Sequence, residues 1–194
     1  LEEELFLQLK EAKIDEFEFA AESIEVEKMI LMHFRGYKII EDKELAFIRK
    51  PDQERPVVSG ISGYDFLEIN EECLQNNYQN KDYIVTRIIE AWGTIEKYLN
   101  YGIGFIAVEG DRIAGMILGT ANYENILPID IETLKDHRKK GIATELTRRF
   151  LAYCYDNKLT AYWNCIISNA ESRNIAEKAG FQFIGSKDYY YFNI

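Results

Sequence analysis

One segment, residues 126–165, constrains the fold of this 194-residue chain more than any other. Residues 126–134 have the pattern of a strand, and residues 159–165 form a second strand pattern rich in β-branched and aromatic side chains. Between them, apolar side chains recur at the four-residue spacing of one helical face: Ile142, Leu146, Phe150 and Cys154. Because a strand–helix–strand connection joins parallel neighbours, the segment predicts one parallel pair of strands in a sheet.

The rest of the chain also mixes helices and strands. Before this segment we expect helices over 1–34 (in two pieces) and 71–100 (broken near 76–80), a hairpin of strands 37–41 and 45–49 around the polar turn 42–44, and strands at 64–69, 103–108 and 112–121. After it we expect a helix that starts at Asn169 or Ser172 and ends at Gly180, then one or two strands over 181–192, broken near 185–188. This order predicts an α+β (mixed α/β) fold.

A stretch with two glycines, residues 59–63, marks an expected domain boundary. We predict an N-terminal helical and hairpin extension over residues 1–61 and the main domain over residues 62–194.

Composition excludes several classes of function. The net charge of −10 argues against nucleic acid as a partner, and no apolar run approaches the roughly 18 residues of a membrane helix. Three cysteines, Cys73, Cys154 and Cys165, lack the spacing of metal ligands, so we expect no metal site. Reduced cysteines, and an acidic start unlike a secretory leader, lead us to expect a cytoplasmic protein.

Residues 135–149 reverse the sign of the chain, with six basic residues against two acidic ones. Their central run is Arg138, Lys139, Lys140, Gly141, Ile142, Ala143 and Thr144. Free backbone N–H groups at a helix start attract anions, and Gly141 lets a ligand approach the backbone. The run therefore predicts a phosphate or pyrophosphate site, although a glycine-containing helix cap among solvated lysines explains the same residues equally well.

Two motifs resemble signatures of the GNAT N-acetyltransferase superfamily. Arg-x-x-Gly-x-Ala at residues 138–143 is similar to its acetyl-coenzyme A motif, and it lies between a strand and a helix. Asn-Ala-Glu-Ser at 169–172, followed by Ala-Glu-Lys-Ala-Gly-Phe at 176–181, is similar to its second motif. The resemblance covers residues 62–194. Residues 131–133, together with Trp163-Asn164-Cys165, look most like the zwittermicin A resistance-type members.

The resemblance implies a fold and a set of cofactor contacts. The fold is a central mixed sheet with a splayed parallel strand pair, flanked by helices, and the co-substrate is acetyl-coenzyme A (acetyl-CoA). The implied contacts are the backbone of Ile131 and Thr133, the loop residues Arg138, Lys139, Lys140, Gly141, Ile142, Ala143 and Thr144, and the side chains of Asn169 and Ser172. Helix capping explains Asn169 and Ser172 as well.

Direct acetyl transfer requires a neutral amine, so we expect a carboxylate to accept its proton. Glu132 is the first candidate because it lies in the strand beside the expected thioester. Asp130 shares its strand face by period-two alternation and is the second candidate, and Glu124 is the third. An ordinary surface acid explains each of the three as well.

One position departs from the superfamily. Ala176 stands where many members carry a tyrosine that protonates the leaving thiolate, so Tyr189 or Tyr190 could serve, or the thiol could leave unassisted. We expect N-acetyl transfer to a primary amine of a small molecule or peptide, and the acidic surplus favours a cationic acceptor. The alternative is a non-catalytic acyl-CoA-binding regulatory or interaction module, and homodimerisation is left open.

Overall fold

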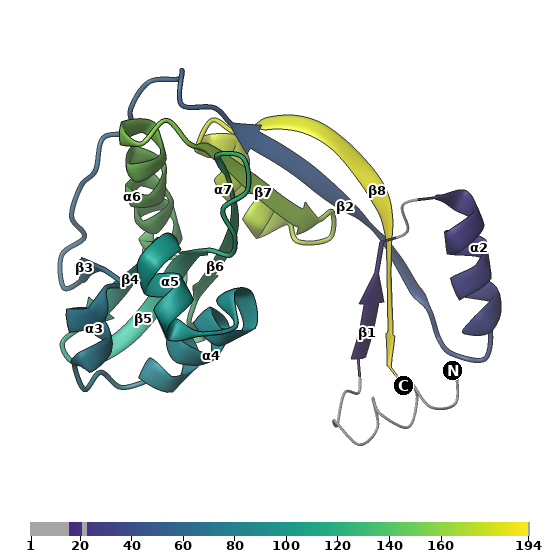
Figure 1. The fold of residues 1–194 in the computed structure, drawn as a ribbon, viewed down its shortest axis with the longest axis horizontal. Coiled ribbons are helices and arrows are strands. Elements are labelled where there is room, and N and C mark those ends of the chain that lie inside the picture. The colour runs from purple at the N-terminus through teal and green to yellow at the C-terminus, as the bar shows by residue number, and fades with distance from the viewer. Residues whose placement is uncertain (1–15, 21–22, 194) are drawn as a thin grey trace. The chain divides into compact units, whose positions relative to one another are not determined.

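The computed structural model describes residues 16–20 and 23–193. Contacts divide the chain into two units, drawn in Figure 1. The smaller unit takes its residues from 1–46, 165–173 and 184–194, and the larger unit from 47–164 and 174–183. The contact boundary thus falls between residues 46 and 47, inside a strand, whereas the sequence predicted a division after residue 61.

The described residues form eight strands and six α-helices. The strands are β1 (Glu16–Phe19), β2 (Ile40–Arg49), β3 (Asp65–Glu68), β4 (Gly104–Glu109), β5 (Arg112–Gly119), β6 (Ile126–Thr133), β7 (Thr160–Ile166) and β8 (Gln182–Asn193). The helices are α2 (Ile24–His33), α3 (Glu71–Gln75), α4 (Lys81–Trp92), α5 (Ile95–Tyr101), α6 (Ile142–Asp156) and α7 (Ala170–Lys178). Hydrogen-bonded neighbours follow the order β1-β8-β2-β7-β6-β5-β4-β3, which is a mixed sheet and confirms the predicted fold class.

In the larger unit, helices cover both faces of the sheet. Ile88 of α4 belongs to the same buried cluster as Leu118 of β5, which places α4 and α5 on one face. On the other face, Phe150 of α6 lies against Gly119 of β5. The predicted apolar stripe of α6 is buried, and β6 and β7 are parallel, so the crossover predicted for residues 126–165 is confirmed.

Two predicted breaks are wrong. Residues 37–49 were expected to form a hairpin, but β2 runs without interruption from Ile40 to Arg49. The break expected near 185–188 is also absent, since β8 continues through those residues. Cross-strand ion pairs explain both: Lys43 pairs with Asp188 at 2.7 Å and Lys187 pairs with Glu44 at 2.9 Å.

The N-terminal prediction is only partly correct. Residues 16–19 were expected to be helical, but they form β1, which pairs antiparallel with β8. Phe19 faces Tyr190 in that ladder, and their rings stack with centroids 4.9 Å apart. Helix α2 is confirmed, with Ser23 as its N-cap. The helix expected over residues 1–15 lies outside the described residues.

Within the described part of the chain, no helix combines the length and apolar character needed to cross a bilayer. Cys73, Cys154 and Cys165 are buried, and no disulfide joins them.

Candidate functional site

The parallel pair β6 and β7 is hydrogen-bonded over only part of its length. Its register holds three residue pairs: Ile126 with Thr160, Leu127 with Ala161 and Pro128 with Tyr162. Strand β6 continues to Thr133 and strand β7 to Ile166. The hydrogen-bonded ladder between these described strands ends at the pair Pro128–Tyr162. The two strands therefore separate toward their C-terminal ends, as the resemblance had implied.

Backbone groups of β6 face this gap. The N–H of Leu134 donates to Ala114 O at 2.9 Å, so even-numbered residues of this stretch direct their backbone groups toward β5. Because these directions alternate along an antiparallel pair, the N–H and C=O of Ile131 and Thr133 point away from β5, toward the β7 side. A strand-like ligand would pair with these groups, and at the Thr133 C=O it would compete with Arg138 Nε, which donates to it at 3.1 Å.

The loop before α6 has the geometry of an anion site. Gly141 adopts a φ of +85°, in the left-handed region, and it is the N-cap of α6. A Cβ at this position would meet only Ile61 Cδ1, at 3.6 Å, so the space above the glycine is open. No side chain caps the first turn of α6, which leaves its backbone N–H groups available to a ligand.

Several basic side chains of residues 135–149 are held within the protein. Arg138 Nε donates to Thr133 O at 3.1 Å, and Lys140 Nζ donates to the Tyr64 hydroxyl at 2.8 Å. Arg148 and Arg149 pair with Glu145, a buried carboxylate in the first turn of α6, at 3.5 and 3.3 Å. Arg138 and Lys140 keep their positive charge, because both of their partners are neutral, but each has a donor group engaged within the protein.

Two carboxylates of β6 meet helix α4. The Tyr83 hydroxyl donates a hydrogen bond to Glu132 Oε2. Arg87, one turn further along α4, lies 3.9 Å from Glu132 Oε2 through Nη2 and 3.4 Å from Asp130 Oδ2 through Nε. The shared partner confirms the predicted period-two placement of Asp130 and Glu132 on one face of β6.

The environment changes the proton affinity of this cluster. Burial raises the pKa of Asp130, and the nearby charge of Arg87 opposes that rise. Burial, with the hydrogen bond to Glu132, raises the pKa of Tyr83 to about 12, so Tyr83 remains a hydrogen-bond donor at neutral pH. The cluster therefore contains a partly buried acid pair with a fixed donor and one cation.

Tyr83 and Arg87 were not predicted as site residues. They lie more than 40 positions before Glu132, on a helix that the sequence identified only as a helix. Their spacing of four residues, which places a tyrosine and an arginine on one face of a helix, was the available signal.

Comparison with known proteins identifies the family. A family model described as GNAT acetyltransferase matches residues 2–190. The chain belongs to the GNAT acetyltransferase family. The match extends well beyond residues 62–194, the range on which the sequence resemblance rested.

Relatives of this GNAT chain agree in fold. An uncharacterized N-acetyltransferase of Bacillus subtilis, YdfB, is 29% identical over 150 residues, which are 77% of this chain and 56% of that protein. The chain thus spans little more than half of that relative. A GCN5-related N-acetyltransferase-like protein from Streptococcus suis has a TM-score of 0.72 at 17% identity, over 90% of this chain and 70% of the other. A GCN5-related N-acetyltransferase from Sphaerobacter thermophilus has a TM-score of 0.58 at 17% identity, over 92% and 59% of the two chains.

Two other residues predicted from the sequence lie at a helix start and in a turn. Asn169 Oδ1 accepts a hydrogen bond from the Ser172 N–H at 3.1 Å, so Asn169 caps α7. Glu124 is exposed in the turn before β6, with a φ of +47°.

The two tyrosines suggested in place of the expected GNAT acid both belong to the smaller unit. Ala176 is fully buried, with 0% of its surface exposed. Tyr190, one suggested substitute, belongs to the smaller unit and donates its hydroxyl hydrogen to Glu27 Oε1 at 2.7 Å. Tyr189 belongs to the same unit, where its ring lies 6.3 Å from that of Tyr191.

Proposed function

We propose that the chain is an N-acetyltransferase that moves the acetyl group of acetyl-CoA directly to a primary amine. The observation that carries the proposal is the gap between β6 and β7, beside the glycine turn at Gly141. An extended ligand with an anionic end fits this pair of features, because strand backbone outside the β6–β7 ladder would hold the extended part and helix N–H groups would hold the anionic end.

Different residues around the gap would bind different parts of acetyl-CoA. The backbone of Ile131 and Thr133 would hold the pantetheine arm, and the N–H groups of residues 139–144 would hold the pyrophosphate. The family resemblance adds Asn169 and Ser172 as further contacts. Thr133 C=O already accepts from Arg138, so Arg138 would have to release it or share it.

Acetyl-CoA supplies an activated thioester, and the chain supplies proton transfer and orientation. Glu132 accepts the proton from the ammonium of the acceptor, which frees the nitrogen lone pair for attack on the carbonyl carbon. A backbone N–H of β6 in the gap stabilises the charge that develops on the carbonyl oxygen. The nitrogen then releases its second proton to solvent, the carbon–sulfur bond breaks to leave a neutral amide that carries the acetyl group, and the thiolate takes up a proton from solvent.

The acceptor class follows from charge. Asp130 and Glu132 carry two negative charges against the single positive charge of Arg87, and the chain as a whole carries −10. This field favours a cationic amine. The resemblance to zwittermicin A resistance-type acetyltransferases makes amino-group antibiotics the first acceptors to test, followed by polyamines and peptide N-termini.

The test has two stages. Thermal melts of cofactor-free protein should shift upward with acetyl-CoA, since saturation at about 100 times the dissociation constant adds about 2.7 kcal/mol of stability. A screen of amines that records released thiol should then find turnover. A melt that does not move with acetyl-CoA would reject the proposal.

A second function is favoured by one observation. Buried Ala176 leaves the usual acid position of the family without a proton donor, as in a non-catalytic acyl-CoA-binding regulatory module. Binding of acetyl-CoA without thiol release, over the whole amine panel, would select this alternative.

A further inference from the structure

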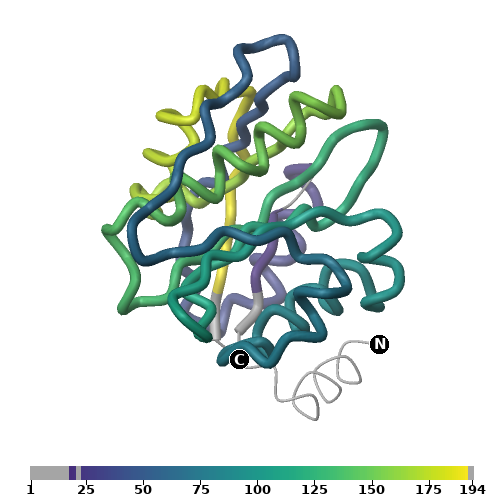
Figure 2. Tube along the Cα trace, turned by 90° about the vertical axis from the view of Figure 1, so that its left-hand side faces the viewer, coloured from purple at the N-terminus to yellow at the C-terminus, as the bar shows by residue number. Residues whose placement is uncertain are grey.

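A second polar pocket lies in the larger unit, on the side of α6 covered by the segment that follows β2. Figure 2 shows this segment running beside the helix. The pocket has a volume of about 490 Å³, which is within the usual range for small-molecule sites. Its lining residues are Arg49, Glu54, Arg55, Pro56, Val57, Ser59, Arg148, Leu151, Lys178 and Ala179.

Arg49 is the unusual member of this lining. Only 7% of its surface is exposed, and among the described residues no carboxylate pairs with it. Its Nη2 donates to the backbone oxygen of Glu54 at 2.6 Å, while Nε is buried without a hydrogen-bond partner. Burial lowers the pKa of the Arg49 guanidinium, but arginine stays charged at neutral pH in proteins. A buried cation without a counter-ion is costly, and an anion in the pocket would supply one.

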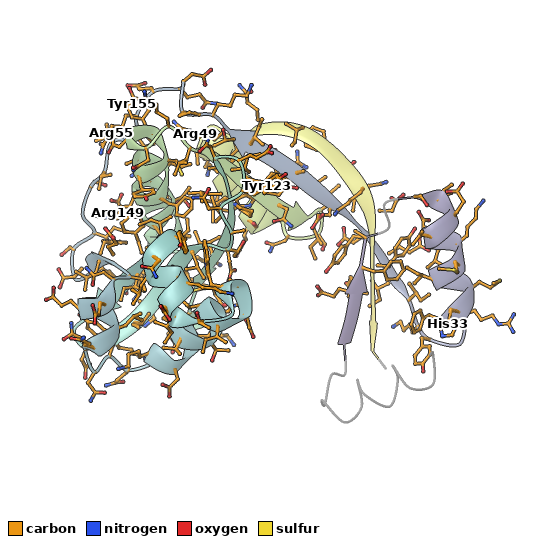
Figure 3. All side chains as sticks on the ribbon, in the orientation of Figure 1. His33, Arg49, Arg55, Tyr123, Arg149 and Tyr155 are labelled. Carbon is orange, nitrogen blue, oxygen red and sulfur yellow. The ribbon has the colours of Figure 1, made fainter. Side chains whose placement is uncertain are left out.

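The remaining charges of the pocket are also mostly positive. Arg55 forms a two-bond pair with Asp156, at 2.8 and 2.7 Å, so its charge is largely balanced. Lys178 has no ion pair among the described residues, and Arg148 lies 3.5 Å from Glu145 with its side chain 47% exposed. Glu54 is the single acid in the lining. Arg49 and Arg55 are labelled in Figure 3, on β2 and on the segment after it.

This pocket is separate from the loop at residues 138–144. Its α6 residues are Arg148 and Leu151, seven and ten positions after Gly141. At 1.5 Å per residue, they lie about 10 and about 15 Å along the helix axis from the free N–H groups. The lining contains none of residues 138–144, so an anion held by those residues would lie outside this pocket.

We propose that this pocket binds a small organic phosphate, with the phosphate group on Arg49, Arg148 and Lys178 and the organic part against Val57 and Leu151. Guanidinium groups present paired donors that match phosphate oxygens, and the lysine adds a point charge. Val57 is 78% exposed, so a bound organic group would cover apolar surface that water now contacts. The proposal does not depend on acetyl transfer.

Calorimetry on the full chain tests the charged part, with inorganic phosphate as the probe at constant ionic strength. Lys178→Gln and Arg49→Gln should each weaken binding about tenfold or more, because each removes a charge-assisted hydrogen bond. Arg112→Gln is the matched control. Its side chain is 44% exposed, similar to the 47% of Arg148, and Arg112 does not line the pocket. If Arg49→Gln fails to fold, exposed Lys178 still gives the result.

Phenyl phosphate tests the apolar part. It should bind about tenfold more tightly than inorganic phosphate, because the ring buries apolar surface. Val57→Ser should remove most of that gain and leave the affinity for inorganic phosphate unchanged.

Three outcomes would overturn the proposal. The first is no saturable binding of either phosphate. The second is equal weakening by Lys178→Gln and Arg112→Gln, which would indicate diffuse charge and no defined site. The third is loss of phosphate binding at saturating coenzyme A, which would assign the anion to the cofactor site. Retained binding under that condition supports a separate site.

Discussion

The Tyr83 hydroxyl donates a hydrogen bond to the carboxylate of Glu132, and this contact joins helix α4 to strand β6. Arg87 extends the same connection to Asp130, 3.4 Å away. One face of α4 thus orients both carboxylates on the strand that borders the gap. Because the acceptor amine must lose its proton close to that gap, the position of α4 bears directly on the proposed chemistry.

Replacement of Glu132 by glutamine should slow acetyl transfer. The change keeps the shape of the side chain and removes its proton affinity, and loss of a general base typically lowers the rate by about 10²–10⁴. The affinity for acetyl-CoA should change little, since backbone groups are expected to hold it. The deficit should shrink at high pH, where more of the acceptor amine is already neutral. Thiol release measured against pH provides the data.

Two further variants locate the base. Glu124→Gln, in the exposed turn before β6, should leave the rate unchanged. A normal rate for Glu132→Gln would remove Glu132 from the mechanism, and a collapse in Asp130→Asn alone would transfer the role to Asp130.

Asp130 should make the free energy of unfolding depend on pH. Burial raises its pKa above the ordinary value of 3.8. The folded protein therefore keeps this proton to higher pH than the unfolded chain. The stabilising contribution is full below the unfolded pKa and is lost as pH rises through the folded pKa. Asp130→Asn should consequently gain stability relative to the parent chain as pH rises above the ordinary value of 3.8.

Urea unfolding curves across this pH range measure the effect. Glu96→Gln, at an exposed position, is the control and should follow the parent chain. Parallel trends for Asp130→Asn and the parent would contradict the expected burial of the charge.

Substitutions at Gly141 should separate backbone strain from charge. Gly141→Asn and Gly141→Asp have similar shapes, and both place a side chain at a φ of +85°. Each should cost about 1 kcal/mol in folding. Only the aspartate adds a negative charge beside the expected pyrophosphate, so it should bind acetyl-CoA far more weakly than the asparagine variant. Calorimetry with acetyl-CoA compares them, and equal affinities would place the anion site elsewhere.

Glu145 should be important for stability. Its two carboxylate oxygens accept hydrogen bonds from the N–H and hydroxyl of Ser59, at 2.9 and 3.0 Å. Glu145→Ala removes both bonds and the carboxylate that pairs with Arg149, so it should lower the free energy of unfolding by about 2–4 kcal/mol. Arg148→Gln removes a half-exposed partner and leaves Glu145 paired with Arg149 and Ser59, so it should cost less than about 1 kcal/mol. Urea melts distinguish the two, and similar small losses would show that the Ser59 contact contributes little.

The sequence pattern was sufficient to predict an element whose structure depends on residues close to it in the chain. The four-residue apolar spacing of α6 and the glycine before it predicted the crossover and the exposed turn at Gly141. Pattern failed where distant residues decide the outcome: Asp42, Lys43 and Glu44 read as a polar turn, but partners on β8 keep them in a strand. The separation of β6 from β7 has no local signature, and only the family resemblance implied it.

The candidate site shows the same division. Asp130 and Glu132 were predicted from strand alternation, which depends on neighbours in the sequence. Tyr83 and Arg87 reach them across the packing of α4 on the sheet, and that packing could not be derived from spacing along the chain.

The pairing of β1 with β8 has a consequence for synthesis of the protein. Residues 16–19 of β1 pair with residues 190–193 of β8, so β1 has no partner strand until β8 has been synthesised. On the ribosome, an early strand would leave the exit tunnel with its edge unpaired throughout translation of everything between. Closing so long a loop is slow compared with forming the local contacts of β3 to β6. Late assembly of the smaller unit would make it the part of the nascent chain most exposed to chaperones and proteases.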